Sequence, residues 1–116
     1  MNQFGPGIFD NDVAQSVRDE FNTAVAQGLS VYAAADRVLA RPFDFMKEND
    51  RDQVFLALAA LQLEHGVIQP KIKKNALTVI ILGDDLETWE SKGPTQHAAR
   101  RQILQDLRQK LIDTVN

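Results

Sequence analysis

Hydrophobic residues recur every three or four positions in the first third of the chain, which is the spacing of one face of an α-helix. A first helix is predicted over about 12–27, because Asp10, Asn11 or Asp12 can cap its start and Gly28 follows it. A second is predicted over about 31–40, because Ser30 can cap its start and Pro42 disfavours the helical conformation in Arg41 before it. The two stripes are Val13, Val17, Phe21, Ala24 and Val25, and then Val31, Ala34, Val38 and Leu39.

Residues 54–61 are hydrophobic without interruption, so a helix here would be apolar on every face and would belong in the centre of the fold. A buried strand is the alternative, but the alanine and leucine content and the length favour a helix over about 53–65. Asp50 or Asp52 can cap its start, and Gly66 can close it. The pattern predicts an all-α fold of five to six helices packed around this central apolar helix.

A fourth helix is predicted from Pro70 to Gly83, although residues 76–82 are rich in β-branched side chains and leave a strand open. A lone strand would leave its backbone hydrogen bonds unpaired, which favours the helix. Asp84 and Asp85 are then expected to cap a short turn over 86–90. A last amphipathic helix is predicted over about 95–114, with its apolar stripe formed by Ala99, Ile103, Leu104, Leu107, Leu111 and Ile112.

Two segments have no such period. Gly5-Pro6-Gly7 predicts an extended N-terminal arm over residues 1–10, and residues 42–52 are predicted to form a loop. That loop contains Phe43, Phe45 and Met46, which either close an edge of the core or form an exposed contact patch. The length of 116 residues fits one domain over 1–116.

Composition narrows the functional classes. The chain has no cysteine, so disulfides and thiolate metal sites are excluded, and 44% hydrophobic with 25% charged residues is typical of a globular protein. The uncharged hydrophobic stretch 53–63 is too short to cross a bilayer, and the start of the sequence lacks the features of a secretory signal. We therefore expect no membrane association and a cytoplasmic location.

Charge is distributed unevenly along the sequence. Residues 1–69 contain ten acidic and five basic residues, a net charge of −5, whereas residues 70–116 contain six acidic and eight basic residues, a net charge of +2. An acidic surface repels the phosphate backbone, so nucleic-acid binding is disfavoured unless a local basic stripe dominates. The candidates for such a stripe are Lys71, Lys73, Lys74, Arg100, Arg101, Arg108 and Lys110.

Candidate chemistry is sparse. His65 and His97 lie far apart without a second histidine at helical spacing, so no metal or other cofactor is predicted. The acid pairs Asp10/Asp12, Asp50/Asp52 and Asp84/Asp85 are explained as helix caps. The neighbouring Arg18 and Asp19 are expected to have a structural role, with Arg18 in an ion pair with Asp12 or with an acid of another element. No catalytic residue is predicted, and Trp89, the sole tryptophan, is expected to anchor the core rather than a partner.

The segment Gly5–Ala14, followed by Val17–Phe21, resembles the opening of a small bacterial family of unknown function, W-G-x-G-x-F-x-[ND]-D-x-A and then V-R-D-x-[YF]. The likeness continues through Val54–Ala59 with Gln62 and Gly66, Ala76–Leu77, Asp85–Leu86 with Trp89, and Ala99–Arg101 with Leu104. Phe4 and Leu56 stand where the family has tryptophan and another aromatic residue. The resemblance implies a compact, mostly helical cytoplasmic protein and supplies no catalytic residue.

These observations favour a non-catalytic protein-binding or regulatory module, for instance an immunity-type inhibitor of a basic partner protein. Its expected contact residues are Asp10, Asp12, Arg18, Asp19, Phe43, Phe45 and Met46. One alternative is a small enzyme with Asp12, Arg18, Asp19 and His65 near the first helix. Another is nucleic-acid binding through the basic last helix. Homo-oligomerisation is compatible with the sequence but has no specific signal.

Overall fold

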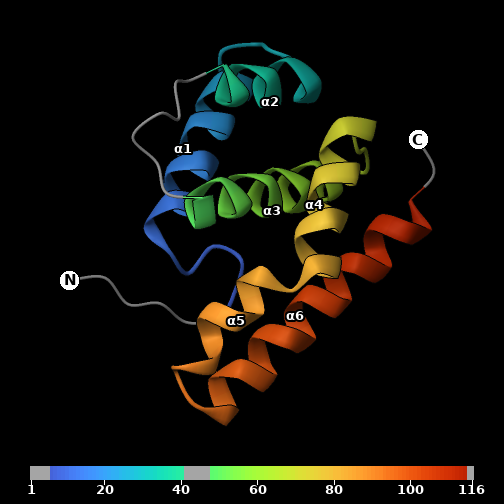
Figure 1. The fold of residues 1–116 in the computed structure, drawn as a ribbon. Coiled ribbons are helices and arrows are strands. Elements are labelled where there is room, and N and C mark those ends of the chain that lie inside the picture. Colours follow the sequence, from blue (N-terminus) through green and yellow to red (C-terminus); the bar gives the residue numbers. More distant parts are fainter. Residues whose placement is uncertain (1–5, 41–47, 115–116) are drawn as a thin grey trace.

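The computed structural model describes residues 6–40 and 48–114, which form six α-helices and no strand (Figure 1). The helices are α1 (Asp12–Ala26), α2 (Val31–Leu39), α3 (Glu48–Glu64), α4 (Pro70–Leu82), α5 (Asp84–Glu90) and α6 (Pro94–Asp113). The predicted all-α fold is confirmed, and residues 76–82 are helical.

Helix α3 lies at the centre and contacts each of the other described helices (Figure 1). Its residues 56–59 are completely buried, as expected of a helix that is apolar on all sides. The start of α3 was predicted wrongly, because the helix begins at Glu48, inside the segment expected to be a loop. Asp50 and Asp52 therefore lie within α3 and do not cap it. Acidic residues in a first turn favour helix because they face the positive end of its dipole.

Helix α1 packs against α2 and α3 through Ala14, Val17, Phe21 and Ala24, which are buried. The last three belong to the predicted stripe, whereas its other members, Val13 and Val25, are only half-buried. Asn11 caps the helix, since its Oδ1 accepts a hydrogen bond from the Ala14 backbone N–H at 2.8 Å. The predicted cap is confirmed and falls on Asn11 rather than on either neighbouring aspartate. Ser30 caps α2 in the same way, as predicted.

Helices α4, α5 and α6 form the second part of the fold, in which the long helix α6 runs beside α4 and α5 (Figure 1). Gly83 ends α4 in the left-handed conformation, with φ of +76°, and is also the residue that precedes α5. Asp84 and Asp85 are therefore the first residues of α5, and their predicted capping role is wrong. The backbone position that they were expected to occupy belongs to Gly83.

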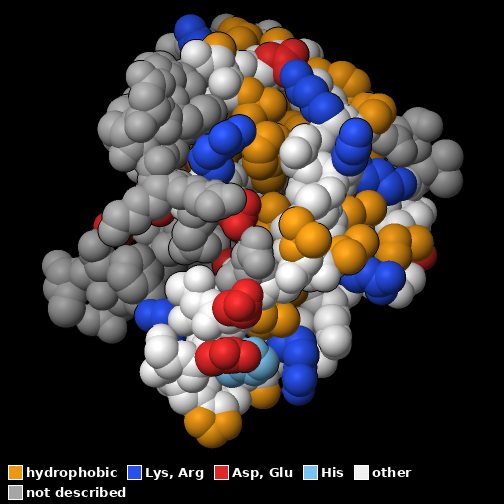
Figure 2. Space-filling view, viewed as in Figure 1, with side chains coloured by type: hydrophobic (Ala, Val, Ile, Leu, Met, Phe, Trp, Pro, Cys, Tyr) orange, Lys and Arg blue, Asp and Glu red, His pale blue; other side chains and the backbone are white. Residues whose placement is uncertain are grey.

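Some large hydrophobic side chains are exposed, among them Ile112, which was assigned to the predicted apolar stripe of the last helix. Ile81 is 68% and Ile112 is 47% exposed, and Leu82 is also exposed. The core face of α4 is Ile72, Ala76 and Val79, so Ile81, which lies about 200° around the helix from Val79, points away from it. Figure 2 shows, on the face of the molecule turned towards the viewer, hydrophobic side chains lying between basic ones. No helix in the described part of the chain combines the length and hydrophobicity needed to span a membrane.

Candidate functional site

An ion pair is buried between α5 and α6. The Arg100 Nε donates to Asp85 Oδ2 at 2.8 Å, and Arg100 Nη2 donates to Asp85 Oδ1 at 3.2 Å. Both side chains are almost completely shielded from solvent. Removing two charges from water costs free energy, and a two-point guanidinium–carboxylate contact offsets that cost only when the remaining donors and acceptors are also satisfied.

The side-chain amide of Gln53, on α3, bonds both members of the pair, and Asn11, the cap of α1, bonds Gln53 in turn. Arg100 Nη2 also donates to Gln53 Oε1 at 3.0 Å, and Gln53 Nε2 donates to Asp85 Oδ1 at 2.6 Å. Asn11 Nδ2 donates to the same Gln53 oxygen at 3.2 Å. Among the described residues, no buried side-chain polar atom lacks a hydrogen-bond partner. These contacts fix α3, α5, α6 and the start of α1 relative to one another.

The same arginine holds the segment that precedes α1. Arg100 Nη1 donates to the carbonyl oxygens of Pro6 at 3.0 Å and of Gly7 at 3.2 Å. Asp10 Oδ2 accepts a hydrogen bond from the Gly7 N–H at 2.8 Å, which closes a turn. The described part of the predicted extended arm, residues 6–10, is therefore a turn held against α6, and the Asp10 carboxylate forms part of that turn.

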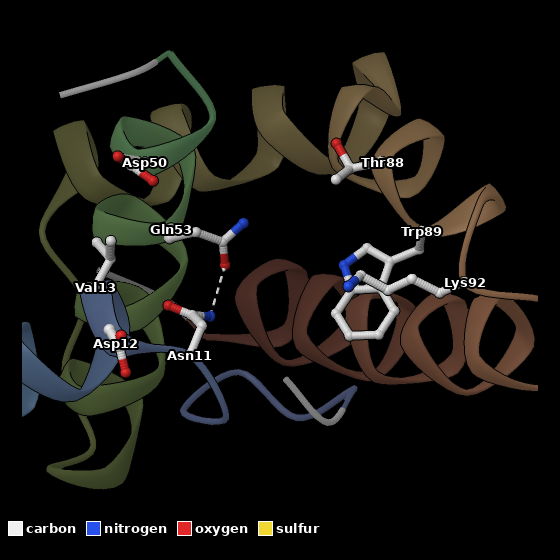
Figure 3. A pocket seen from close by; sticks show the side chains of 8 residues that line it. All are labelled: Asn11, Asp12, Val13, Asp50, Gln53, Thr88, Trp89 and Lys92. Atoms are coloured by element: carbon white, nitrogen blue, oxygen red, sulfur yellow. Dashed lines mark hydrogen bonds between the residues drawn. The ribbon is translucent and has the colours of Figure 1, made fainter. Parts of the chain in front are cut away.

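A pocket of about 340 Å³ opens beside this network (Figure 3). It is lined by Asn11, Asp12, Val13, Asp50, Gln53, Thr88, Trp89 and Lys92. The start of α1 and the first turns of α3 form one side, and α5 with the residues after it forms the other. The pocket therefore lies where the network joins the helices.

The indole of Trp89 forms an aromatic wall of this pocket. Trp89 is only 6% exposed, so its expected burial is confirmed, yet its ring also lines the pocket. The guanidinium carbon of Arg100 lies 5.5 Å from the ring centroid, and the Lys92 Nζ lies 5.2 Å from it. Figure 3 shows Asp12 and Asp50 across the pocket from Trp89 and Lys92. The pocket therefore combines an aromatic wall with carboxylates on the facing side.

The other residues singled out in the sequence lie apart. Asp19 lines a shallower hollow of about 490 Å³ between α1 and α2, together with Arg37 and other polar residues. The Arg18 guanidinium stacks over the Phe9 ring at 5.0 Å, whereas the His65 ring lies 5.8 Å from that of Phe21.

Among the described residues, no hydrogen bond or ion pair joins Asp12, Arg18, Asp19 and His65. Phe43, Phe45 and Met46 lie outside the described residues. Of the predicted contact residues, Asp10 belongs to the turn ahead of α1, Asp12 is the first residue of α1, and Asp19 lies further along the same helix.

The predicted basic surface is partly used within the fold. Lys71 Nζ forms an ion pair with Asp36 Oδ1 at 2.7 Å, and Lys73 Nζ donates to the Thr114 carbonyl oxygen at 3.2 Å. The hydrogen bond from Lys71 lowers the pKa of Asp36; partial desolvation opposes this effect, and a hydrogen bond from Gln69 adds to it. Arg100, expected on the solvent side of the last helix, is buried, so that prediction is wrong.

The sequence analysis did not predict the buried network formed by Gln53, Asp85 and Arg100. One signal for them exists, because Arg100 lies four residues before Leu104 and continues the buried stripe Leu104, Leu107 and Leu111 by one turn. A basic residue on an apolar face indicates a buried partner, but neither Asp85 nor Gln53 is marked as that partner by local spacing.

Within the described residues, no three histidine, aspartate or glutamate side chains gather as a metal site would require. No family model, curated protein or solved structure matches the chain. The resemblance to the small bacterial family of unknown function stays a prediction.

Proposed function

We propose that this chain is a non-catalytic protein-binding or regulatory module whose partner presents a basic surface to α1. The observation that carries the proposal is a polar stripe along the exposed side of that helix. Asp12, Ser16, Asp19 and Thr23 are all exposed and follow one another at intervals of four, three and four residues. At 3.6 residues per turn, these side chains share one face of α1.

This α1 stripe joins two concave regions of the surface. At its first end, Asp12 lines the pocket beside Trp89, and further along, Ser16, Asp19 and Thr23 line the hollow between α1 and α2. A partner lying along α1 would therefore meet a carboxylate at each hollow. This continuity supports an extended protein contact over a single small-molecule site.

Electrostatics support a basic partner. The sequence up to residue 69 has a net charge of −5, and this part of the chain includes all of α1. Complementary charge accelerates association and selects between partners more than it raises affinity. The enzyme alternative receives no comparable support, because Arg18 and His65 contact aromatic rings and, among the described residues, neither is hydrogen-bonded or ion-paired to Asp12 or Asp19.

Charge reversal on α1 tests the proposal. The variant Asp12→Lys/Asp19→Lys reverses both carboxylates of the stripe, and the matched control is Asp106→Lys/Asp113→Lys, which makes the same change at the same spacing on the exposed side of α6. Circular dichroism first establishes that both variants are folded. Affinity capture from the organism that encodes the chain identifies a binding protein, and its purified form is then titrated against all three proteins.

We expect a basic protein that binds the wild type and the α6 variant, with affinity that falls as salt is added. Reversal of the two α1 carboxylates should weaken binding at least about tenfold, because two attractive contacts become repulsive. Equal binding by the α1 and α6 variants would remove α1 as the docking surface.

A further inference from the structure

The walls of the pocket beside Trp89 have the chemistry that recognises an organic cation. The face of an indole ring attracts a guanidinium or ammonium group, and this attraction is strongest when the cation is shielded from water. Asp12 and Asp50 place carboxylates among the lining residues, across from the ring (Figure 3). An aromatic wall and facing carboxylates together favour a ligand with an apolar stem and a positive end.

The structure already contains a cation at this position. Lys92 Nζ lies 5.2 Å from the Trp89 ring centroid, and in Figure 3 its chain runs along the indole with its nitrogen towards the pocket. Lys92 is itself exposed, and it lies beyond the end of α5. Its ammonium therefore occupies a site on the ring that an incoming cation would also occupy.

The surrounding residues are held in place before any ligand arrives. Trp89 is buried against Arg100, whose guanidinium is fixed by Asp85. Asn11 and Gln53 are hydrogen-bonded to each other and form the polar part of the lining. A pocket with fixed walls loses little conformational entropy on binding, which favours affinity for a small group.

We propose that this pocket receives an arginine side chain from the partner protein, and that Lys92 is an intramolecular competitor that the arginine displaces from Trp89. Arginine is favoured over lysine because its planar guanidinium can stack on the ring while its N–H groups reach carboxylates. The inference rests on the proposed function and adds to it the chemical group that the partner inserts at one end of the α1 stripe.

Intrinsic fluorescence gives a direct assay, because Trp89 is the only tryptophan in the chain. The probe is N-acetyl-L-arginine methylamide, which presents the side chain without free backbone charges. Its matched control is the citrulline analogue, which is nearly the same shape but neutral. We expect a saturable fluorescence change with the arginine probe and at least about tenfold weaker binding of the citrulline probe.

Variants of the pocket separate the proposed competition from a general charge effect. Lys92→Gln should strengthen binding of the arginine probe about threefold or more, because the competing ammonium is gone. Lys74→Gln makes the same charge change at an exposed position on α4 and should leave the affinity unchanged. Asp12→Asn should weaken binding.

The inference would be overturned by equal binding of the arginine and citrulline probes, by the absence of saturable binding, or by unchanged or weaker binding to Lys92→Gln. Tenfold tighter binding of free arginine than of its blocked form would reassign the pocket to a free amino acid and would also overturn it. These results are distinguishable from failure of the proposed function. If charge reversal on α1 abolishes partner binding but the pocket does not bind the arginine probe, the proposed function is supported and the arginine site is refuted.

Discussion

Replacing Arg100 by methionine removes the positive charge at the centre of the buried network while keeping a long side chain in its place. Asp85 then remains buried with Gln53 as its partner in the network, and the Pro6 and Gly7 carbonyls lose their donor. Removing one member of a buried ion pair leaves an uncompensated charge, which typically costs about 3–5 kcal/mol. We therefore expect the free energy of unfolding to fall by about that amount.

That loss is large compared with the total stability of a domain of this size, which is typically about 5–15 kcal/mol. At the usual entropy of unfolding per residue, each kcal/mol lowers the melting temperature by about 4 °C, so the expected drop is about 10–20 °C. Replacing Asp85 by leucine as well removes the stranded carboxylate. A buried ion pair replaced by two apolar side chains is often close to neutral, so Arg100→Met/Asp85→Leu should regain most of the lost stability.

Urea and thermal unfolding followed by circular dichroism measure both quantities. The matched control is Arg101→Met, which makes the same substitution one residue away at an exposed position and should change stability by about 0.5 kcal/mol or less. Hydrogen exchange in the Arg100→Met variant should show faster exchange of the Gly7 amide, which is bonded to Asp10 in the wild type. If Arg100→Met and Arg101→Met cost the same, the network does not hold the fold together as described.

Three further predictions concern single residues. Lys71→Met should destabilise the protein by about 0.2–1 kcal/mol at neutral pH and by less at about pH 2. The sign follows from the lowered pKa of Asp36: its ion pair with Lys71 adds stability at pH values above the unfolded-state pKa of 3.8, and this contribution is lost as the pH falls through the folded-state pKa. An equal loss of stability at both pH values in urea titrations would contradict this prediction. Asn11→Ala should lower the free energy of unfolding by about 1–2 kcal/mol in the same titrations, because it removes the α1 cap and the hydrogen bond to Gln53 on α3. The control Asn75→Ala removes an exposed hydrogen bond within α4 and should lower it by less than about 0.5 kcal/mol. Gly83→Ala should cost about 1–2 kcal/mol in thermal unfolding through backbone strain alone, since an added Cβ meets no atom within 4 Å at φ +76°; an unchanged melting temperature would argue against that strain.

The helix boundaries that sequence predicts well are those set by neighbouring residues. Asn11 and Ser30 cap α1 and α2 through backbone N–H groups three residues away, and Gly83 ends α4 through its own left-handed conformation. The start of α3 was predicted too late because no such local signal marks it. Its first turn, from Glu48, is polar and adds nothing to the hydrophobic pattern, so the pattern placed the helix start several residues too late.

The candidate site is less accessible to sequence reasoning because its contacts join distant residues. Arg100 meets Gln53 across 47 positions and Gly7 across 93, and no local spacing connects them. Asp85 fitted a capping role, because aspartate is among the residues preferred at the N-cap of a helix. The α1 stripe can be predicted from the sequence, because the spacing of Asp12 and Asp19 alone places them on one helical face. The adjoining pocket cannot, because it depends on where α5 packs.

The long reach of Arg100 has a consequence for the order in which the chain acquires its structure. During synthesis, α1, α2 and α3 leave the ribosome well before residue 100, so Gln53 and the Pro6–Gly7 carbonyls initially lack the donor that they share in the finished fold. The early helices can associate through their apolar faces, but the turn ahead of α1 cannot be locked until the arginine emerges. A nascent chain stalled before that point should therefore be cleaved by protease ahead of α1, and one extended well past it should resist.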